Sequence, residues 1–219
     1  MHRLFYSPAA CSMAVHIVLE EIGEPYETEL VSTRPGGGTG TAAWKVRNPK
    51  CRVPALTGVP GRIGGEGDLL TEAHAILFYL ARTHPKARLL PTDPAGEARA
   101  IEWMNWLSGS VHAMSFGQIW RSGRFVVDEK DYAAVQSKGQ QNVREQFAYI
   151  EALLADGRDW AVPGAYSVVD PYLLVFYNWG GLIGLDMAAA YPAWRDLTVR
   201  TLQRPAVQRV LAKEQVALS

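Results

Sequence analysis

The chain has 219 residues, 48% hydrophobic and 20% charged, which is an ordinary globular balance and argues against disorder. Lysine plus arginine equals aspartate plus glutamate at 22 each, so the formal net charge is zero, which argues against a nucleic-acid-binding or membrane-surface protein. No apolar run approaches the roughly 20 residues of a membrane span, and we expect no signal peptide. The two cysteines, Cys11 and Cys51, are therefore expected to be free thiols in a reducing cytoplasm.

The first eighty residues alternate between short strands and helices. We expect a strand at 3–6, a helix at 11–22 and a strand at 26–31, followed by a glycine-rich loop. A short apolar strand at 53–56, the end of another at 69–70 and a helix capped by Thr71 complete this part. The order is too short and too broken by turns for a dinucleotide-binding domain.

Proline-rich residues 83–94 separate this part from a region with a different pattern. Helical periodicity recurs at 95–107, 129–154 and 168–182, and we find no strand signal there. The sequence therefore predicts an α/β domain at 1–82, a linker at 83–94 and an all-helical domain at 95–219. The chain is long enough to form two compact domains.

The sharpest local feature is the turn from Tyr6 to Ser12, between the first strand and the first helix. A thiol at a helix N-terminus meets unpaired N–H groups and the positive end of the dipole, so the pKa of Cys11 is predicted to be lowered. The same place suits the thiolate of a bound ligand. The alternatives are that Cys11 is a small buried apolar residue and that Ser12 only caps the helix.

Pro54 heads a predicted strand, where it cannot donate to the sheet, so it needs an edge or a special turn. If the Val53–Pro54 bond is cis, the backbone of Val53 can pair with an extended, peptide-like ligand. Glu72 and the free N–H groups where Thr71-Glu72-Ala73-His74 opens a helix could hold the ammonium and carboxylate of an amino-acid ligand. The alternative is an ordinary acidic first turn.

In the helical region, Asn105 and His112 are seven positions apart, about two helical turns. They could point together into a cleft, or His112 could be a structural residue. Ser167 and Asp170 match a capping box, which we interpret as structural.

In this order, the segments resemble the glutathione transferases, particularly the bacterial beta-like class, over nearly the whole chain. The matching segments are Tyr6-Ser7-Pro8 with Cys11-Ser12, Asn48-Pro49-Lys50 with Val53-Pro54-Ala55-Leu56, Leu70-Thr71-Glu72-Ala73 with Ala75-Ile76 and Tyr79-Leu80, Glu102-Trp103-Met104-Asn105-Trp106 with His112, and Ser167-Val168-Val169-Asp170. The resemblance implies a thioredoxin-like domain that binds glutathione, followed by an all-α domain that supplies the second substrate's pocket. It further implies a cytoplasmic homodimer that acts in detoxification and needs no metal.

Carried over by position, the resemblance assigns catalytic roles to Cys11 as the active-site thiol, to Ser12 as a hydroxyl donor and to His112. The implied glutathione-binding residues are Tyr6, Arg34, Arg52, Val53, Pro54, Glu72, Ala73 and Asn105. The implied pocket for an apolar electrophile contains Phe116, Trp120 and Phe176.

Three positions depart from the family pattern. Ala73 stands where many members have serine, and Cys51 replaces a common glycine. No lysine obviously meets the glycyl carboxylate of glutathione, and the candidates that remain open are Arg34, Lys45 and Arg52.

The function implied is conjugation, in which the thiolate of glutathione attacks a small apolar electrophile. A second hypothesis is a glutathione-dependent thiol–disulfide oxidoreductase, in which Cys11 forms a mixed disulfide. A third is a non-catalytic protein that binds glutathione or apolar ligands.

Overall fold

The computed structural model describes residues 1–61 and 68–218. Its N-terminal part is a sheet with the strand order β2-β1-β3-β4. The strands and helices of this part are β1 (His2–Tyr6), α1 (Ser12–Ile22), β2 (Tyr26–Leu30), α2 (Ala42–Arg47), β3 (Ala55–Leu56), β4 (Leu70–Thr71) and α3 (Ala73–Thr83). Strand β1 pairs parallel with β2 and antiparallel with β3, and β3 pairs antiparallel with β4. This is the thioredoxin-like arrangement expected from the sequence.

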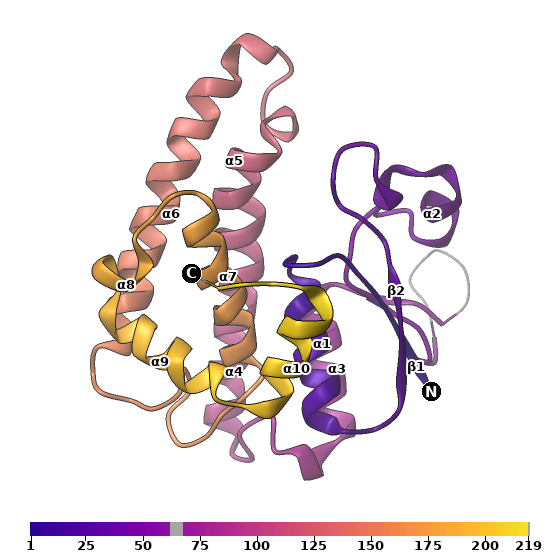
Figure 1. Cartoon of the computed structure of the whole chain (residues 1–219), viewed down its shortest axis with the longest axis vertical. Helices are drawn as coiled ribbons and strands as arrows, with labels where there is room; N and C mark the ends of the chain where they lie inside the picture. Colours follow the sequence, from indigo (N-terminus) through magenta and orange to yellow (C-terminus); the bar gives the residue numbers. More distant parts are fainter. Residues whose placement is uncertain (62–67, 219) are drawn as a thin grey trace.

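The alternation of side chains along β1 builds a core on each face of the sheet. Leu4 is fully buried in the large core that includes residues of α1 and α3. Phe5 points into a smaller core on the other face, where its ring packs 5.0 Å from that of Trp44 in α2. The sheet therefore lies between α1 and α3 on one face and α2 on the other (Figure 1).

The rest of the described chain is helical, as expected from its periodicity. The helices are α4 (Pro94–Trp106), the π-helical stretch η3 (Leu107–Phe116), α5 (Gly117–Trp120), α6 (Tyr132–Leu154), α7 (Val169–Leu182), α8 (Met187–Ala190), α9 (Pro192–Leu202) and α10 (Pro205–Glu214). Buried aromatic side chains hold this part together; for example, the ring of Phe147 in α6 packs 4.8 Å from that of Trp194 in α9. None of the described helices is long and apolar enough to cross a membrane.

Several local predictions are confirmed and others are wrong. The capping box forms as predicted: the Asp170 carboxylate accepts the backbone N–H of Ser167 at 2.7 Å, and the Ser167 hydroxyl accepts the N–H of Val169 at 3.3 Å. Thr71, expected as a helix cap, instead ends β4, and α3 starts after Glu72. Helix α2 lies where no helix was predicted, because its six residues are too few to display a period.

The two parts of the chain are joined along α1. Figure 1 shows the C-terminal helix α10 beside α1, and three pairs of acidic and basic residues cross this contact. Arg204 binds Glu21, Arg209 binds Glu20, and His16 binds Glu214. Helix α1 therefore serves both as a layer on the sheet and as a surface for the helical part.

Candidate active site

The loop between β1 and α1 carries Cys11, which occupies the N-cap position of α1. Its thiol donates a hydrogen bond to the backbone carbonyl of Val53 across 3.4 Å. The Val53–Pro54 peptide bond is cis, the isomer that the sequence left open. The structure thus brings together the two segments that the sequence singled out most strongly.

The prediction that the pKa of Cys11 is lowered is wrong. Burial raises the pKa of this thiol to about 12, although the backbone N–H groups of Cys11 and Ser12 act in the opposite direction. Only 6% of Cys11 is exposed, so loss of hydration outweighs the helix N-terminus. Cys11 is therefore a protonated thiol at neutral pH.

Ser12 is completely buried, and its hydroxyl is already engaged. It donates to the carbonyl oxygen of Ser7 and accepts from the N–H of Ser7, each at 3.1 Å. The hydroxyl that was expected to donate to a ligand's sulfur instead closes the turn of the loop in this structure.

The segment before Pro54 is shaped by Asn48, whose side-chain amide donates to the carbonyl of Arg52 at 2.9 Å. Cys51 adopts a φ of 53°, in the left-handed region where glycine is favoured. Its thiol is half-buried and faces the carbonyl of Pro49. The glycine common at this position in the implied family is thus explained by its backbone conformation.

Glu72 has a φ of 73° at the residue that precedes α3. Such a backbone is uncommon for a residue other than glycine and is often found at functional sites. Its exposed carboxylate lies 2.6 Å from the ammonium group of Lys50, which also donates to the hydroxyl of Thr71 at 2.9 Å. Lys50 is a charged residue of this site to which the sequence analysis gave no role; the only signal was its place in Asn-Pro-Lys.

His112 lies in η3, with its ring edge-on to that of Trp179 at 4.8 Å. Burial lowers the pKa of His112 to about 4, and three cationic side chains contribute to this shift, namely Arg52, Arg124 and Arg121. The imidazole is therefore neutral at pH 7 and able to donate one hydrogen bond and accept another. The ring therefore lies within the electrostatic influence of three arginines. Arg52 comes from the N-terminal part of the chain, and Arg121 and Arg124 come from the helical part.

Asn105 and His112, which the sequence placed on one α-helical face, lie in two different elements, α4 and the π-helical η3. Asn105 is exposed and hydrogen-bonds to His74 in α3. The wider turns of the π-helix, which starts at Leu107, rotate later residues away from the positions that an α-helical period gives them.

The other expected residues are placed as follows. The ring of Tyr6 packs on that of His16, with centroids 5.4 Å apart. Phe116 and Phe176 are fully buried and offer no surface to a ligand in this structure, while Trp120 is 38% exposed. Arg34 is exposed and lies at the edge of a groove beside the loop.

This groove has a volume of about 380 Å³ and runs between the β1–α1 loop, α7 and the C-terminal tail. Its lining residues are Pro8, Ala9, Arg34, Asn178, Leu182, Glu214, Gln215, Val216 and Ala217. Asn178 is 8% exposed, and its side-chain nitrogen has no partner among the described residues. The groove thus combines apolar walls with hydrogen-bond donors.

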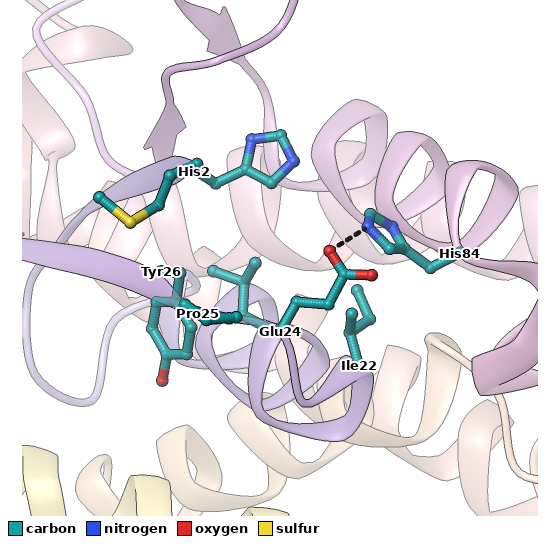
Figure 2. Close-up of a pocket in the computed structure, with 8 residues that line it drawn as sticks. His2, Ile22, Glu24, Pro25, Tyr26 and His84 are labelled. Atoms are coloured by element: carbon teal, nitrogen blue, oxygen red, sulfur yellow. Dashed lines mark ion pairs between the residues drawn. The ribbon is translucent and has the colours of Figure 1, made fainter.

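A second, smaller cavity of about 100 Å³ lies at the opposite end of α1 (Figure 2). It is lined by His2, Glu24 and His84, and the imidazole of His84 is 3.5 Å from the carboxylate of Glu24. The 11 residues of α1 span about 16 Å, so this cavity is remote from Cys11. No group of three described His, Cys, Asp or Glu residues is arranged to hold a metal ion.

Comparisons with known proteins agree with the fold. Residues 9–83 match the family described as glutathione S-transferase, N-terminal domain. Glutathione S-transferase GstA of Escherichia coli O157:H7 is 30% identical over 221 residues, which cover 97% of this chain and 98% of that protein. A glutathione transferase homologue from Sulfitobacter, solved with bound glutathione, superposes with a TM-score of 0.87 at 29% identity and covers 99% of each chain.

A relative with a different named activity also matches almost end to end. Disulfide-bond oxidoreductase YfcG of Escherichia coli (strain K12) is 24% identical over 216 residues, which cover 99% of this chain and 97% of that protein. The likeness therefore extends to proteins named as glutathione transferases and to one named as a disulfide-bond oxidoreductase.

Proposed function

The chain belongs to the glutathione S-transferase family, and on this basis we propose that it conjugates the thiol of glutathione to small apolar electrophiles. The observation that carries the proposal is the 3.4 Å contact between the Cys11 thiol and the Val53 carbonyl. This contact joins the start of α1 to the segment with the cis bond, beside the strained residue Glu72 that precedes α3. Two helix N-termini and a free backbone edge suit a short peptide that carries a thiol and carboxylates.

In this proposal, the backbone of Val53 pairs with the cysteinyl unit of glutathione. Glu72 accepts from the γ-glutamyl ammonium, and the N–H of Ala73 donates to its carboxylate. Arg52 or Arg34 meets the glycyl carboxylate, since both are exposed cations: Arg34 lies beside the loop, and the charge of Arg52 acts on Cys11. Tyr6 supports the loop through its contact with His16.

The chemical step we propose uses the thiolate of glutathione as the nucleophile. Its proton passes to water, the sulfur attacks the electrophilic carbon, and a C–S bond forms. With an aryl halide the halide departs with its electron pair, and with an enal the C=C π pair moves to an enolate that takes a proton from water. N–H groups at the start of α1 stabilise the thiolate. The neutral His112 donates a hydrogen bond to it, a role that its lowered pKa permits.

We place the electrophile in the groove beside the β1–α1 loop. Pro8, Leu182 and Val216 supply apolar wall there, whereas Phe116 and Phe176 are fully buried and are not among its lining residues. Trp120 remains a candidate for direct contact, because it is partly exposed.

The redox alternative rests on the likeness to a disulfide-bond oxidoreductase. It requires Cys11 to attack as a thiolate, and burial raises the pKa of this thiol to about 12. Conjugation is the stronger proposal, because it needs no ionisation of Cys11. We further propose a cytoplasmic homodimer with a role in detoxification, on the family resemblance alone.

The test is a calorimetric titration of the protein with reduced glutathione, followed by turnover of a panel of activated aryl halides and enals. Saturation at about 100 times the dissociation constant should raise the free energy of unfolding by about 2.7 kcal/mol. Conjugation that survives in Cys11→Ala supports our proposal. Disulfide exchange that depends on Cys11, without conjugation, supports the redox alternative, and binding without turnover supports a carrier.

A further inference from the structure

We propose that Glu214, the last residue of α10, is a positioning residue that fixes the loop carrying Cys11 in its working conformation. The inference rests on the proposed function, because it assumes that this loop holds the thiol of glutathione. It assigns the end of the C-terminal helix a part in the reaction, although that helix supplies no group to the reacting atoms.

The loop is held at Ala9 by two side chains from the helical part of the chain. The N–H of Ala9 donates to the Glu214 carboxylate at 3.0 Å, and its carbonyl accepts from the indole N–H of Trp179 at 2.7 Å. Both backbone polar groups of one loop residue are thus bound by residues 205 and 170 positions away. We call this arrangement of Ala9, Glu214 and Trp179 the Ala9 clamp.

Ala9 needs such a clamp because of its backbone conformation. Its φ is 58°, in the left-handed region that a residue with a Cβ adopts only at an energetic cost. Without outside contacts, the loop would be expected to relax toward more favourable angles. Cys11 follows two positions later, so a shift at Ala9 moves the N–H groups at the start of α1.

The Glu214 carboxylate is buried for this contact and has both oxygens engaged. It is 4% exposed, and its second oxygen lies 2.8 Å from Nδ1 of His16, a residue that is 1% exposed. Burying a carboxylate is unfavourable unless it is paired and hydrogen-bonded. A surface residue would serve equally well if Glu214 only joined α10 to α1.

The same two helices provide a matched control. Arg204, the residue that precedes α10, binds Glu21 near the other end of α1, with nitrogen–oxygen distances of 2.6 and 2.9 Å. This pair joins the same helices as Glu214 and His16, but Glu21 lies close to the end of α1 that is remote from Cys11. Loss of Glu21 therefore weakens the packing of α10 without releasing Ala9.

The experiment compares Glu214→Ala, Glu214→Gln and Glu21→Ala with wild type, at a temperature where circular dichroism finds all of them folded. We expect Glu214→Ala to lower kcat for conjugation by about tenfold to a hundredfold, because small misplacements of reacting groups have effects of that size. The KM for glutathione should change less, since the residues that hold its ends are untouched. Glu214→Gln should recover part of the loss, because its amide oxygen can still accept from Ala9. Glu21→Ala should keep the wild-type kcat.

A second readout does not depend on turnover. In a Cys51→Ser background, the rate at which a neutral alkylating reagent modifies Cys11 reports how well the loop covers this buried thiol. We expect about a tenfold faster modification in Glu214→Ala and no change in Glu21→Ala. If Glu214→Ala does not fold, Trp179→Phe removes the other half of the clamp while keeping an aromatic ring, and the same two readouts apply.

The outcomes separate the two proposals. A wild-type protein that neither binds nor consumes glutathione refutes the proposed function, whereas the alkylation rates still test the clamp. If wild type is active and Glu214→Ala keeps its kcat and its slow alkylation, or if Glu21→Ala matches Glu214→Ala in both, the clamp is refuted.

Discussion

The ammonium group of Lys50 lies 2.6 Å from the carboxylate of Glu72 and fixes the side chain that precedes α3. About half of each side chain is exposed, so the pair contributes little to the stability of the fold. Under the proposed function, the γ-glutamyl ammonium of glutathione would take the place of Lys50 at the Glu72 carboxylate.

We therefore expect Glu72→Gln to weaken glutathione binding by about tenfold, the effect of losing one charge-assisted hydrogen bond. The melting temperature without ligand should stay the same. Isothermal titration calorimetry measures the affinity, and Glu102→Gln, which breaks the exposed pair with Arg99, is the control. An unchanged affinity in Glu72→Gln would remove this residue from the binding site.

The two cysteines should differ sharply in reactivity. Cys11 is buried with a raised pKa, whereas Cys51 is half-buried. At pH 7.5, a disulfide reagent should modify Cys51 first and Cys11 at least about tenfold more slowly, because the thiolate is the reactive form. Mass spectrometry of timed samples, with Cys51→Ser as the control, measures both rates. Faster reaction at Cys11 would favour the redox alternative.

Features that depend on neighbouring residues can be predicted from the sequence, whereas features that depend on packing cannot. The strand order, most of the helices and the capping box of α7 follow from local patterns, because each depends on residues close together in the chain. Helix α2 does not, because six residues display no period. The Ala9 clamp joins residues 205 positions apart, and no local signal connects them. The pKa of Cys11 was predicted in the wrong direction, because burial is a property of the packed fold and a helix N-terminus is a property of the sequence.

The strained backbone conformations of Ala9 and Glu72 could not be predicted from the sequence either. Glycine marks a left-handed position in a sequence, whereas alanine and glutamate give no such mark. The π-helical stretch at Leu107–Phe116 could not be predicted either, since its apolar residues do not distinguish it from an α-helix.

Gly139 in α6 should be intolerant of a side chain. A Cβ there would lie 2.8 Å from Cβ of Gln118 and 3.0 Å from the carbonyl oxygen of Ser115, so the helices would have to separate. We expect Gly139→Ala to lower the free energy of unfolding by about 1–3 kcal/mol in urea titrations. Gly109 has no atom within 4 Å of its added Cβ, so Gly109→Ala should be neutral or stabilising. Equal effects would argue against close packing at Gly139.

Asp170 should be the most sensitive capping residue of the described chain. It is fully buried and accepts the N–H groups of Ser167 and Ala161 at 2.7 and 2.9 Å. Replacement by alanine leaves both donors buried without a partner, which costs about 1–3 kcal/mol each. The exposed cap Asp186 accepts the N–H of Ala189 at 3.0 Å, and Asp186→Ala should cost only about 1 kcal/mol. Denaturant titration of both variants measures the difference, and similar losses would contradict the role of burial.

Asp170 and His112 should give opposite slopes to the pH dependence of stability. Burial raises the pKa of Asp170 to about 6, against about 3.9 in an unfolded chain. Between those values the unfolded state releases its proton first, so stability falls as pH rises. Burial lowers the pKa of His112 to about 4, against about 6.5 when unfolded. In that window the unfolded state binds more protons, so stability rises with pH.

The two contributions oppose each other from about pH 4 to 6, and single variants should separate them. Asp170→Asn leaves the slope of His112, so the melting temperature should rise with pH more steeply than in wild type. His112→Gln leaves the slope of Asp170, so the rise should be flattened or reversed. Calorimetric scans across this range measure all three slopes. Other titrating groups, such as Glu20 with its pKa lowered to about 2, are common to the three proteins and cancel in the comparison. Parallel slopes would mean that neither group changes its pKa on folding.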